Sequence, residues 1–228
     1  MEINEERADQ STGEQQREVL EFGKVLTRSS ETIQTFVIAG QIEGHAVLPA
    51  PAKTTRYEHI LPQLVQAEES PEIEGVLFLI NTVGGDVEAG LAIAEMIAGM
   101  TKPTVSLVLG GGHSIGIPLA VAADHSLIAP SASMTVHPVR INGLVLSAPQ
   151  SFEYLARMQN RICDFILAHS ATEEKTLSDW MMGRHDMATD IGTILSGEEA
   201  VAGGLMEKVG TFADAMGELK AEIRKRKA

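Results

Sequence analysis

The sequence predicts an α/β domain built around a largely parallel sheet, and three observations predict it. Apolar runs typical of strands alternate along the chain with segments of helical apolar spacing. Several of these runs are short and continuous, as in strands that are buried on both faces of a sheet. Two glycine-rich segments each join such a run to a helix. This alternation favours βαβ units, whose strands lie parallel.

The first half of the chain contains three predicted strands and two predicted helices. Strands are predicted over Thr32–Ala39, over the continuous apolar run Gly75–Ile80 and over Pro103–Leu109. Helical apolar spacing is present over Thr54–Glu69 and over Val87–Met100, and the second of these follows a Gly-Gly-Asp turn. Each buried strand is therefore followed by a helix that can return the chain to the same edge of the sheet.

The second half continues the alternation. A helix over Ser114–Ala123 precedes two short strands, Ser126–Ala129 and Met134–Val136. Ser151–Ser170 is the longest helical candidate, and Glu218–Ala228 is a charged helix whose basic residues come late. Cations at that end suit the negative pole of the helix dipole.

Composition limits the functional classes. The chain has 228 residues, of which 44% are hydrophobic, and 18 basic against 31 acidic residues give a net charge of −13. An acidic chain lacks the basic footprint of a nucleic-acid-binding protein. The single cysteine, Cys163, excludes an intrachain disulfide and a cysteine zinc cage. We expect a cytoplasmic protein without metal, nucleic-acid or membrane partners, since no apolar stretch is long enough to span a bilayer.

The chain is predicted to divide into two parts. Residues 1–28 are polar and charged without a sustained period, so we expect a disordered or loosely attached arm. Residues 29–228 form the predicted domain.

Three segments contain candidate functional residues. In Asn81–Val87, adjacent glycines between a strand and a helix allow backbone N–H groups to approach a ligand, although a simple tight turn explains them as well. In Gly110–Gly116, Ser114 lies at or near the first turn of a helix and matches the G-x-S-x-G pattern of a nucleophile. The alternative role for this serine is a helix N-cap.

The third segment ends in a histidine. His137 closes the short strand Met134–Val136 and follows Ser114 by 23 residues, which is enough for one helix and one strand. A serine nucleophile needs a base, and histidine titrates near neutrality. A partly buried structural histidine is the alternative.

At these three segments the chain resembles the proteolytic subunit of the Clp protease family, and within it the translocation-enhancing (TepA) branch. The resemblance runs from about Thr32 to Gly210 and includes a late block, Leu195–Leu205 (LSGEEAVAGGL). Two positions depart from the usual family pattern. Thr82-Val83 stand where the family often has Ser-Pro, and His113 stands where it usually has a small residue.

The resemblance implies a set of site residues. Ser114 would be the nucleophile and His137 the general base, while the backbone N–H groups of Gly85 and Ile115 would form the oxyanion hole. The family places an acid just upstream of the late block, which implies Asp190 as the third member of a triad. Asp186 is the alternative acid.

The resemblance also implies architecture and partners. It implies a Clp/crotonase-like fold of repeated ββα units, with a protruding strand and helix formed by Val139–Ser147, which carries an Asn-Gly hairpin signal, and by Ser151–Ser170. It implies a serine endopeptidase that acts on peptides or unfolded protein inside a homo-oligomeric ring of heptamer type. An AAA+ unfoldase is a possible partner, and the triad needs no cofactor.

Four other functional hypotheses remain open from the residues. One is an α/β-hydrolase, which would need a late histidine such as His169 or His185. A crotonase-like acyl-CoA enzyme and a ring-forming scaffold without turnover are two more. The fourth, a signal-peptide peptidase with a Ser-Lys dyad, has no lysine in a suggestive context.

Overall fold

The structure is a computed structural model of the chain. It describes residues 24–28, 30–45, 48–49, 51–140, 148–183 and 192–228. The predicted hairpin in Val139–Ser147 lies outside these residues except at its first two positions.

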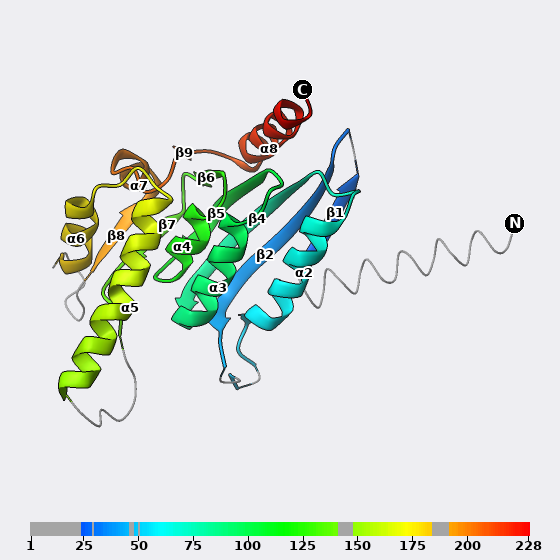
Figure 1. Ribbon diagram of the computed structural model, residues 1–228. Coiled ribbons are helices and arrows are strands. Elements are labelled where there is room, and N and C mark those ends of the chain that lie inside the picture. The colour runs from blue at the N-terminus through cyan, green and yellow to red at the C-terminus, as the bar shows by residue number, and fades with distance from the viewer. Residues whose placement is uncertain (1–23, 29, 46–47, 50, 141–147, 184–191) are drawn as a thin grey trace, which may run out of the picture.

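A twisted sheet with helices on both faces organises the described residues (Figure 1). Its main path runs β1-β2-β4-β5-β6-β9, while β3 pairs with β2, and β7 joins β5 to β8. The strands are β1 (Lys24–Arg28), β2 (Thr32–Glu43), β3 (Thr54–Arg56), β4 (Gly75–Gly85), β5 (Thr104–Gly112), β6 (His125–Ile128), β7 (Ser133–Val136), β8 (Thr193–Ser196) and β9 (Lys208–Val209).

Helices connect the strands as the alternation predicts. They are α2 (Tyr57–Glu69), α3 (Val87–Ala98), α4 (Gly116–Val121), α5 (Ala148–Ala168), α6 (Glu174–Met182), α7 (Gly197–Ala202) and α8 (Phe212–Lys227). The pairs β2–β4, β4–β5, β5–β6 and β6–β9 are parallel, whereas β1–β2 and β7–β8 are antiparallel. The predicted α/β class with a largely parallel sheet is confirmed.

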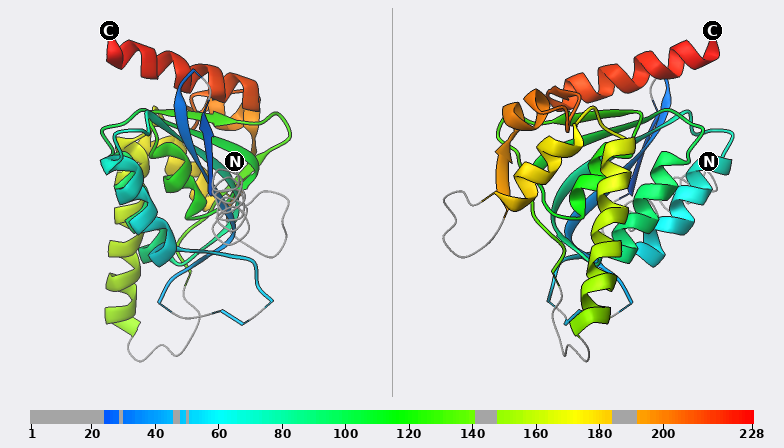
Figure 2. Two further views of the ribbon diagram at one scale, coloured as in Figure 1. Left: turned by 90° about the vertical axis from the view of Figure 1, so that its right-hand side faces the viewer. Right: turned by 60° about the vertical axis from the view of Figure 1, so that its left-hand side comes forward.

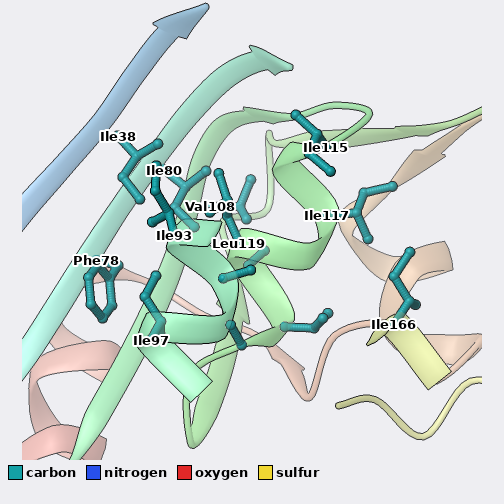
Figure 3. Close-up of a cluster of buried hydrophobic side chains, with 14 of the residues drawn as sticks. Ile38, Phe78, Ile80, Ile93, Ile97, Val108, Ile115, Ile117, Leu119 and Ile166 are labelled. Carbon is teal, nitrogen blue, oxygen red and sulfur yellow. The ribbon is translucent and has the colours of Figure 1, made fainter. Parts of the chain in front are cut away.

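The larger core lies between the sheet and the helices α2 to α5. Figure 3 shows Ile38 and Ile80 from the strands facing Ile93 from α3, and Ile117 from α4 directed toward α5. These side chains are almost fully buried. Branched aliphatic side chains fill this layer, which explains how the chain builds a core with few aromatic residues.

The opposite face of the sheet is covered by α8. Ala215, Leu219 and Ile223 from this helix pack on the strand residues Leu77 and Leu107. In both views of Figure 2, α8, in red, lies across the top of the molecule. The helix begins earlier than the sequence predicts because Thr211 and Asp214 form a capping box.

Helix α5 extends beyond the sheet. In Figures 1 and 2 its N-terminal half projects below the body of the molecule, and Phe152 and Tyr154 on this half are exposed. The helical part of the predicted projection is therefore present. The α5 half nearer the sheet packs on α4, with Ile162 and Ile166 in the core.

Two boundaries differ from the sequence prediction. Lys24–Arg28, which the sequence assigns to the N-terminal arm, form β1 and pair with Thr32–Phe36 of β2. Thr54–Arg56 pair with the end of β2 as β3, so α2 begins at Tyr57. In both places pairing with an adjacent strand overrides the local composition. Among the described residues, no helix is both long and apolar enough to cross a membrane.

Candidate functional site: a serine and a histidine at the carboxyl ends of three strands

A cavity of about 260 Å³ brings the predicted site segments together. It lies where β4, β5 and β7 end, since Gly85 closes β4, Ser114 follows β5 and His137 follows β7. All three residues line this cavity together with Ile115. The carboxyl ends of parallel strands are the usual position of ligand sites in α/β folds.

Ser114 sits in a strained turn between β5 and α4. Its φ is 57°, a left-handed conformation that non-glycine residues rarely adopt. Its backbone N–H donates to the carbonyl of Thr135 on the adjacent β7 at 2.9 Å. The N-cap of α4 is Ile115, and no side chain caps this helix. The helix-cap role is therefore excluded, and Ser114 lines the cavity.

The two glycines leave space for Ser114 and for the neighbouring strand β2. Gly84 has φ +90°, and a Cβ built there would lie 2.7 Å from the Ser114 Cβ. Gly85 has φ +153°, and a Cβ there would lie 2.2 Å from the Ile42 carbonyl oxygen. Side chains are excluded at both positions. The glycine pair therefore forms a tight turn and also allows a close approach of the backbone to its neighbours.

Thr82 anchors this glycine pair. Its hydroxyl donates to the Gly40 carbonyl at 2.6 Å and accepts from the Gly84 N–H at 3.1 Å. Its own carbonyl accepts from the His113 N–H at 3.2 Å. The side chain is buried. A single residue thus connects β2, the glycine pair and the serine turn, at the position where the family often has Ser-Pro.

Gly85 and Ile115 line the cavity beside Ser114, and each has a backbone N–H. Within the described part of the chain, the Ile115 N–H donates to no acceptor. A free donor next to a serine hydroxyl can receive the negative charge that develops on an attacked carbonyl oxygen.

His137 is held by its own backbone. Its Nδ1 lies 2.7 Å from the Pro138 carbonyl oxygen. Because a carbonyl oxygen only accepts, Nδ1 carries the hydrogen of the neutral ring, and the lone pair is on Nε2. This is the tautomer in which Nε2 can take a proton from a hydroxyl.

The predicted acids lie outside the described residues. Asp190 and Asp186 fall in the segment 184–191, so their side chains are not placed. The strand β8 runs antiparallel to β7 with Val136 opposite Thr193, which puts Gly192 beside His137. A Cβ on Gly192 would lie 2.7 Å from the His137 Cβ. The described residue nearest to the histidine on this strand therefore has no side chain.

His113 does not line the cavity. Its Nδ1 lies 2.8 Å from the Thr135 hydroxyl, and its ring packs against Gly111, where a Cβ would lie 2.5 Å from Nε2. Burial lowers the pKa of His113, so the neutral ring is favoured. His113 thus contacts Thr135 and Gly111 and holds the turn that carries Ser114.

The remaining cavity wall comes from residues that the sequence did not single out. Ile162 and Ile166 of α5 and Met181 of α6 form an apolar wall, and Gln41 and Arg140 also line the cavity. The sequence predicts a helix at α5 but carries no signal that its inner face reaches the serine.

His169, one of the two late histidines that the α/β-hydrolase hypothesis would use, does not line this cavity. His169 stacks on Phe165, its Nδ1 contacts the Phe165 carbonyl at 2.8 Å, and it lines a separate cavity between α3 and α5. His185 lies outside the described residues.

Comparison with known proteins gives consistent results. A family model described as Clp protease matches residues 29–212. The translocation-enhancing protein TepA of Halalkalibacterium halodurans is 55% identical over 193 residues, which are 85% of this chain and 75% of that protein. The proteolytic subunit 1 of the ATP-dependent Clp protease of Chlamydia abortus is 26% identical over 140 residues, which are 59% of this chain and 69% of that protein.

A solved structure is similar as well. A mutant of ClpP1 from Listeria monocytogenes superposes with a TM-score of 0.61 and 22% identity, covering 80% of this chain and 94% of that chain. This match shows the fold, and the family model spans most of the sheet and all the segments that line the cavity. The predicted resemblance is confirmed, and the chain belongs to the Clp protease family.

Proposed function

We propose that this chain is a serine peptidase in which Ser114 is the nucleophile and His137 the general base. The observation that carries the proposal is one cavity lined by Ser114, His137, Gly85 and Ile115. The hydroxyl there is not used as a cap, and the Nδ1–H of His137 already has an acceptor. Membership of the Clp protease family supports a peptidase.

The proposed reaction proceeds through an acyl-enzyme. Nε2 of His137 takes the Ser114 proton as Oγ attacks the peptide carbonyl, and the N–H groups of Gly85 and Ile115 receive the oxyanion. The imidazolium then protonates the leaving amine, and the acyl group remains on Ser114. Water attacks the ester with His137 again as base, which releases the carboxylate and restores the serine. These steps need no cofactor.

Asp190 is proposed to stabilise the imidazolium as it forms. The support is chain connectivity, because two peptide units span at most about 7.6 Å and Gly192 packs on the His137 Cβ. Asp186 is farther along the chain from this anchor and remains the alternative.

The cavity suggests the kind of substrate. The apolar wall of Ile162, Ile166 and Met181 suits an aliphatic side chain of a peptide or an unfolded protein. We further propose a homo-oligomeric ring, of heptamer type, in the cytoplasm. The exposed Phe152 and Tyr154 on the projecting half of α5 support contact between copies. An AAA+ unfoldase that feeds the ring belongs to the same proposal.

The test is covalent labelling of the serine. A fluorophosphonate probe should label the wild-type chain, and Ser114→Ala should remove the label and the cleavage of a fluorogenic peptide. Ser178→Ala, at an exposed serine of α6, is the matched control and should retain both. Labelling that persists in Ser114→Ala would contradict the assignment of the nucleophile.

Two other outcomes favour other functions. A wild-type ring that neither takes the probe nor cleaves peptide would favour a scaffold without turnover. Thermal stabilisation by acyl-CoA, with an unlabelled Ser114, would favour a crotonase-like enzyme.

A further inference from the structure

One peptide unit joins His137 to helix α5. The Pro138 carbonyl accepts from His137 Nδ1 at 2.7 Å, and the N–H of the same peptide unit, which belongs to Val139, donates to Gln159 Oε1 at 2.7 Å. The peptide is therefore held at both of its polar ends. The three groups form a continuous chain from the imidazole to a side chain on α5.

The Gln159 amide has one chemically sensible orientation. Its Nε2 donates to Cys163 Sγ at 3.3 Å and to Met181 Sδ at 3.0 Å, while Oε1 accepts from Val139. A flipped amide would set NH₂ against the Val139 N–H, and two donors would then face each other. The Val139 N–H thus fixes the oxygen toward the peptide, and the amide nitrogen lies toward the two sulfur atoms.

The peptide is well suited to orient the ring. A hydrogen bond at a peptide N–H polarises the unit and strengthens its carbonyl as an acceptor. A ring whose Nδ1–H donates to that carbonyl keeps its lone pair on Nε2, which faces the serine cavity in the proposed reaction. Gly192, the described cross-strand neighbour of His137, offers no side chain to do this.

We propose that Gln159 is a positioning residue for His137, acting through the Pro138–Val139 peptide. This rests on the proposed function, in which His137 is the base. The peptide then provides the orientation that a carboxylate provides in a Ser-His-Asp triad. Met181 contacts both Gln159 and the serine cavity, because its Sδ accepts from Gln159 Nε2 and the residue lines the cavity.

The experiment compares two substitutions at one position. Gln159→Leu removes the acceptor, whereas Gln159→Glu keeps an oxygen at the same reach. In assays with a fluorogenic peptide, Gln159→Leu should lower kcat by about tenfold to a hundredfold with KM nearly unchanged. This loss is smaller than the roughly 10⁴-fold loss on altering the orienting carboxylate of a triad. Gln159→Glu should recover kcat to within about threefold.

Cys163→Ala is the matched control. It removes one sulfur contact of the Gln159 amide and leaves the Oε1 bond to Val139 in place. We expect kcat within about twofold of the wild-type value. A Gln159→Leu variant with unchanged kcat would overturn the proposal, and so would an equal loss in Gln159→Glu.

Crystal structures of the two variants test the inference apart from activity. The His137 ring should leave the Pro138 carbonyl in Gln159→Leu and keep that contact in Gln159→Glu. A ring that stays in place in Gln159→Leu overturns the positioning role even if the protein is a peptidase. Absence of any probe labelling of wild-type Ser114 would instead overturn the proposed function.

Discussion

The serine and the histidine of the candidate site are held in different ways. The Ser114 turn is held by main-chain hydrogen bonds, from the Ser114 N–H to the Thr135 carbonyl and from the His113 N–H to the Thr82 carbonyl. His137 is fixed by its own following peptide, which in turn depends on Gln159 of α5. The proposed nucleophile therefore depends on the sheet, whereas the proposed base depends on a helix that extends beyond it.

The difference predicts where each side is vulnerable. Backbone space limits the serine side, because glycine positions there admit no Cβ without moving main-chain atoms or Ser114 itself. On the His137 side, the geometry depends on side-chain hydrogen bonds. Substitutions there remove contacts without creating a steric overlap. Changes on the serine side should therefore be more severe.

The largest effect is expected at Gly84. Gly84→Ala places a Cβ about 2.7 Å from the Ser114 Cβ at a φ of +90°. Displacement of reacting groups by about an ångström costs about a hundredfold in rate, so we expect at least that loss in the rate of probe labelling of Ser114.

Gly217→Ala is the control for this substitution. Gly217 lies in α8 with nothing near its added Cβ. It should keep the labelling rate and stabilise the chain by about 0.5–1 kcal/mol, since alanine is the better helix former. If Gly84→Ala labels at the wild-type rate, tight packing around the serine does not matter for its reactivity.

A smaller effect is expected at Thr82. Thr82→Val keeps the shape but leaves the Gly40 carbonyl and the Gly84 N–H without their hydroxyl partner. We expect about a tenfold loss of kcat in peptide cleavage, because the glycine pair that carries the proposed oxyanion donor is less well held. Thr82→Ser should restore most of it, and equal losses in both variants would show that packing matters more than the hydroxyl.

The smallest effect is expected where α5 meets α3. Arg161 makes two hydrogen bonds to Glu88, and the side chains are 52% and 46% exposed. Exposed ion pairs contribute at most about 1 kcal/mol. Arg161→Gln should therefore lower the midpoint of thermal unfolding at neutral pH by no more than about 4 °C and leave labelling within twofold.

The pH dependence of this pair has a definite sign. The Arg161 hydrogen bond lowers the pKa of Glu88 from its ordinary value of 4.5. The stabilisation is present above that value and is lost as the pH falls through the lowered pKa. The unfolding midpoints of wild type and Arg161→Gln should converge in acid, and a gap that widens there would contradict the ion pair.

The order of strands and helices could be predicted from the sequence, because buried parallel strands appear there as continuous apolar runs. The meeting of the Ser114 and His137 segments could be predicted as well, since parallel strands end at one edge. The structure places both residues in the same cavity. The glycine pair was visible from its composition.

The supporting residues could not be predicted. Gln159 reaches the His137 segment through packing of α5, and a glutamine on an amphipathic helix has no pattern that indicates a partner 20 residues earlier. The role of Thr82 depends on the register between β2 and β4, which shifts beside Gly40. β1 was missed because its composition is that of the polar arm.

The antiparallel neighbour of the histidine also limits how this chain can evolve. Each glycine codon is one nucleotide from a codon for aspartate or glutamate, so a carboxylate directly across from His137 is within reach of a single mutation. The structure closes that route, because φ at Gly192 is +138° and any Cβ would overlap the Val136 carbonyl and His137. An acid that serves this imidazole must therefore come from another position in the chain, as proposed for Asp190, unless the strand end is first remodelled.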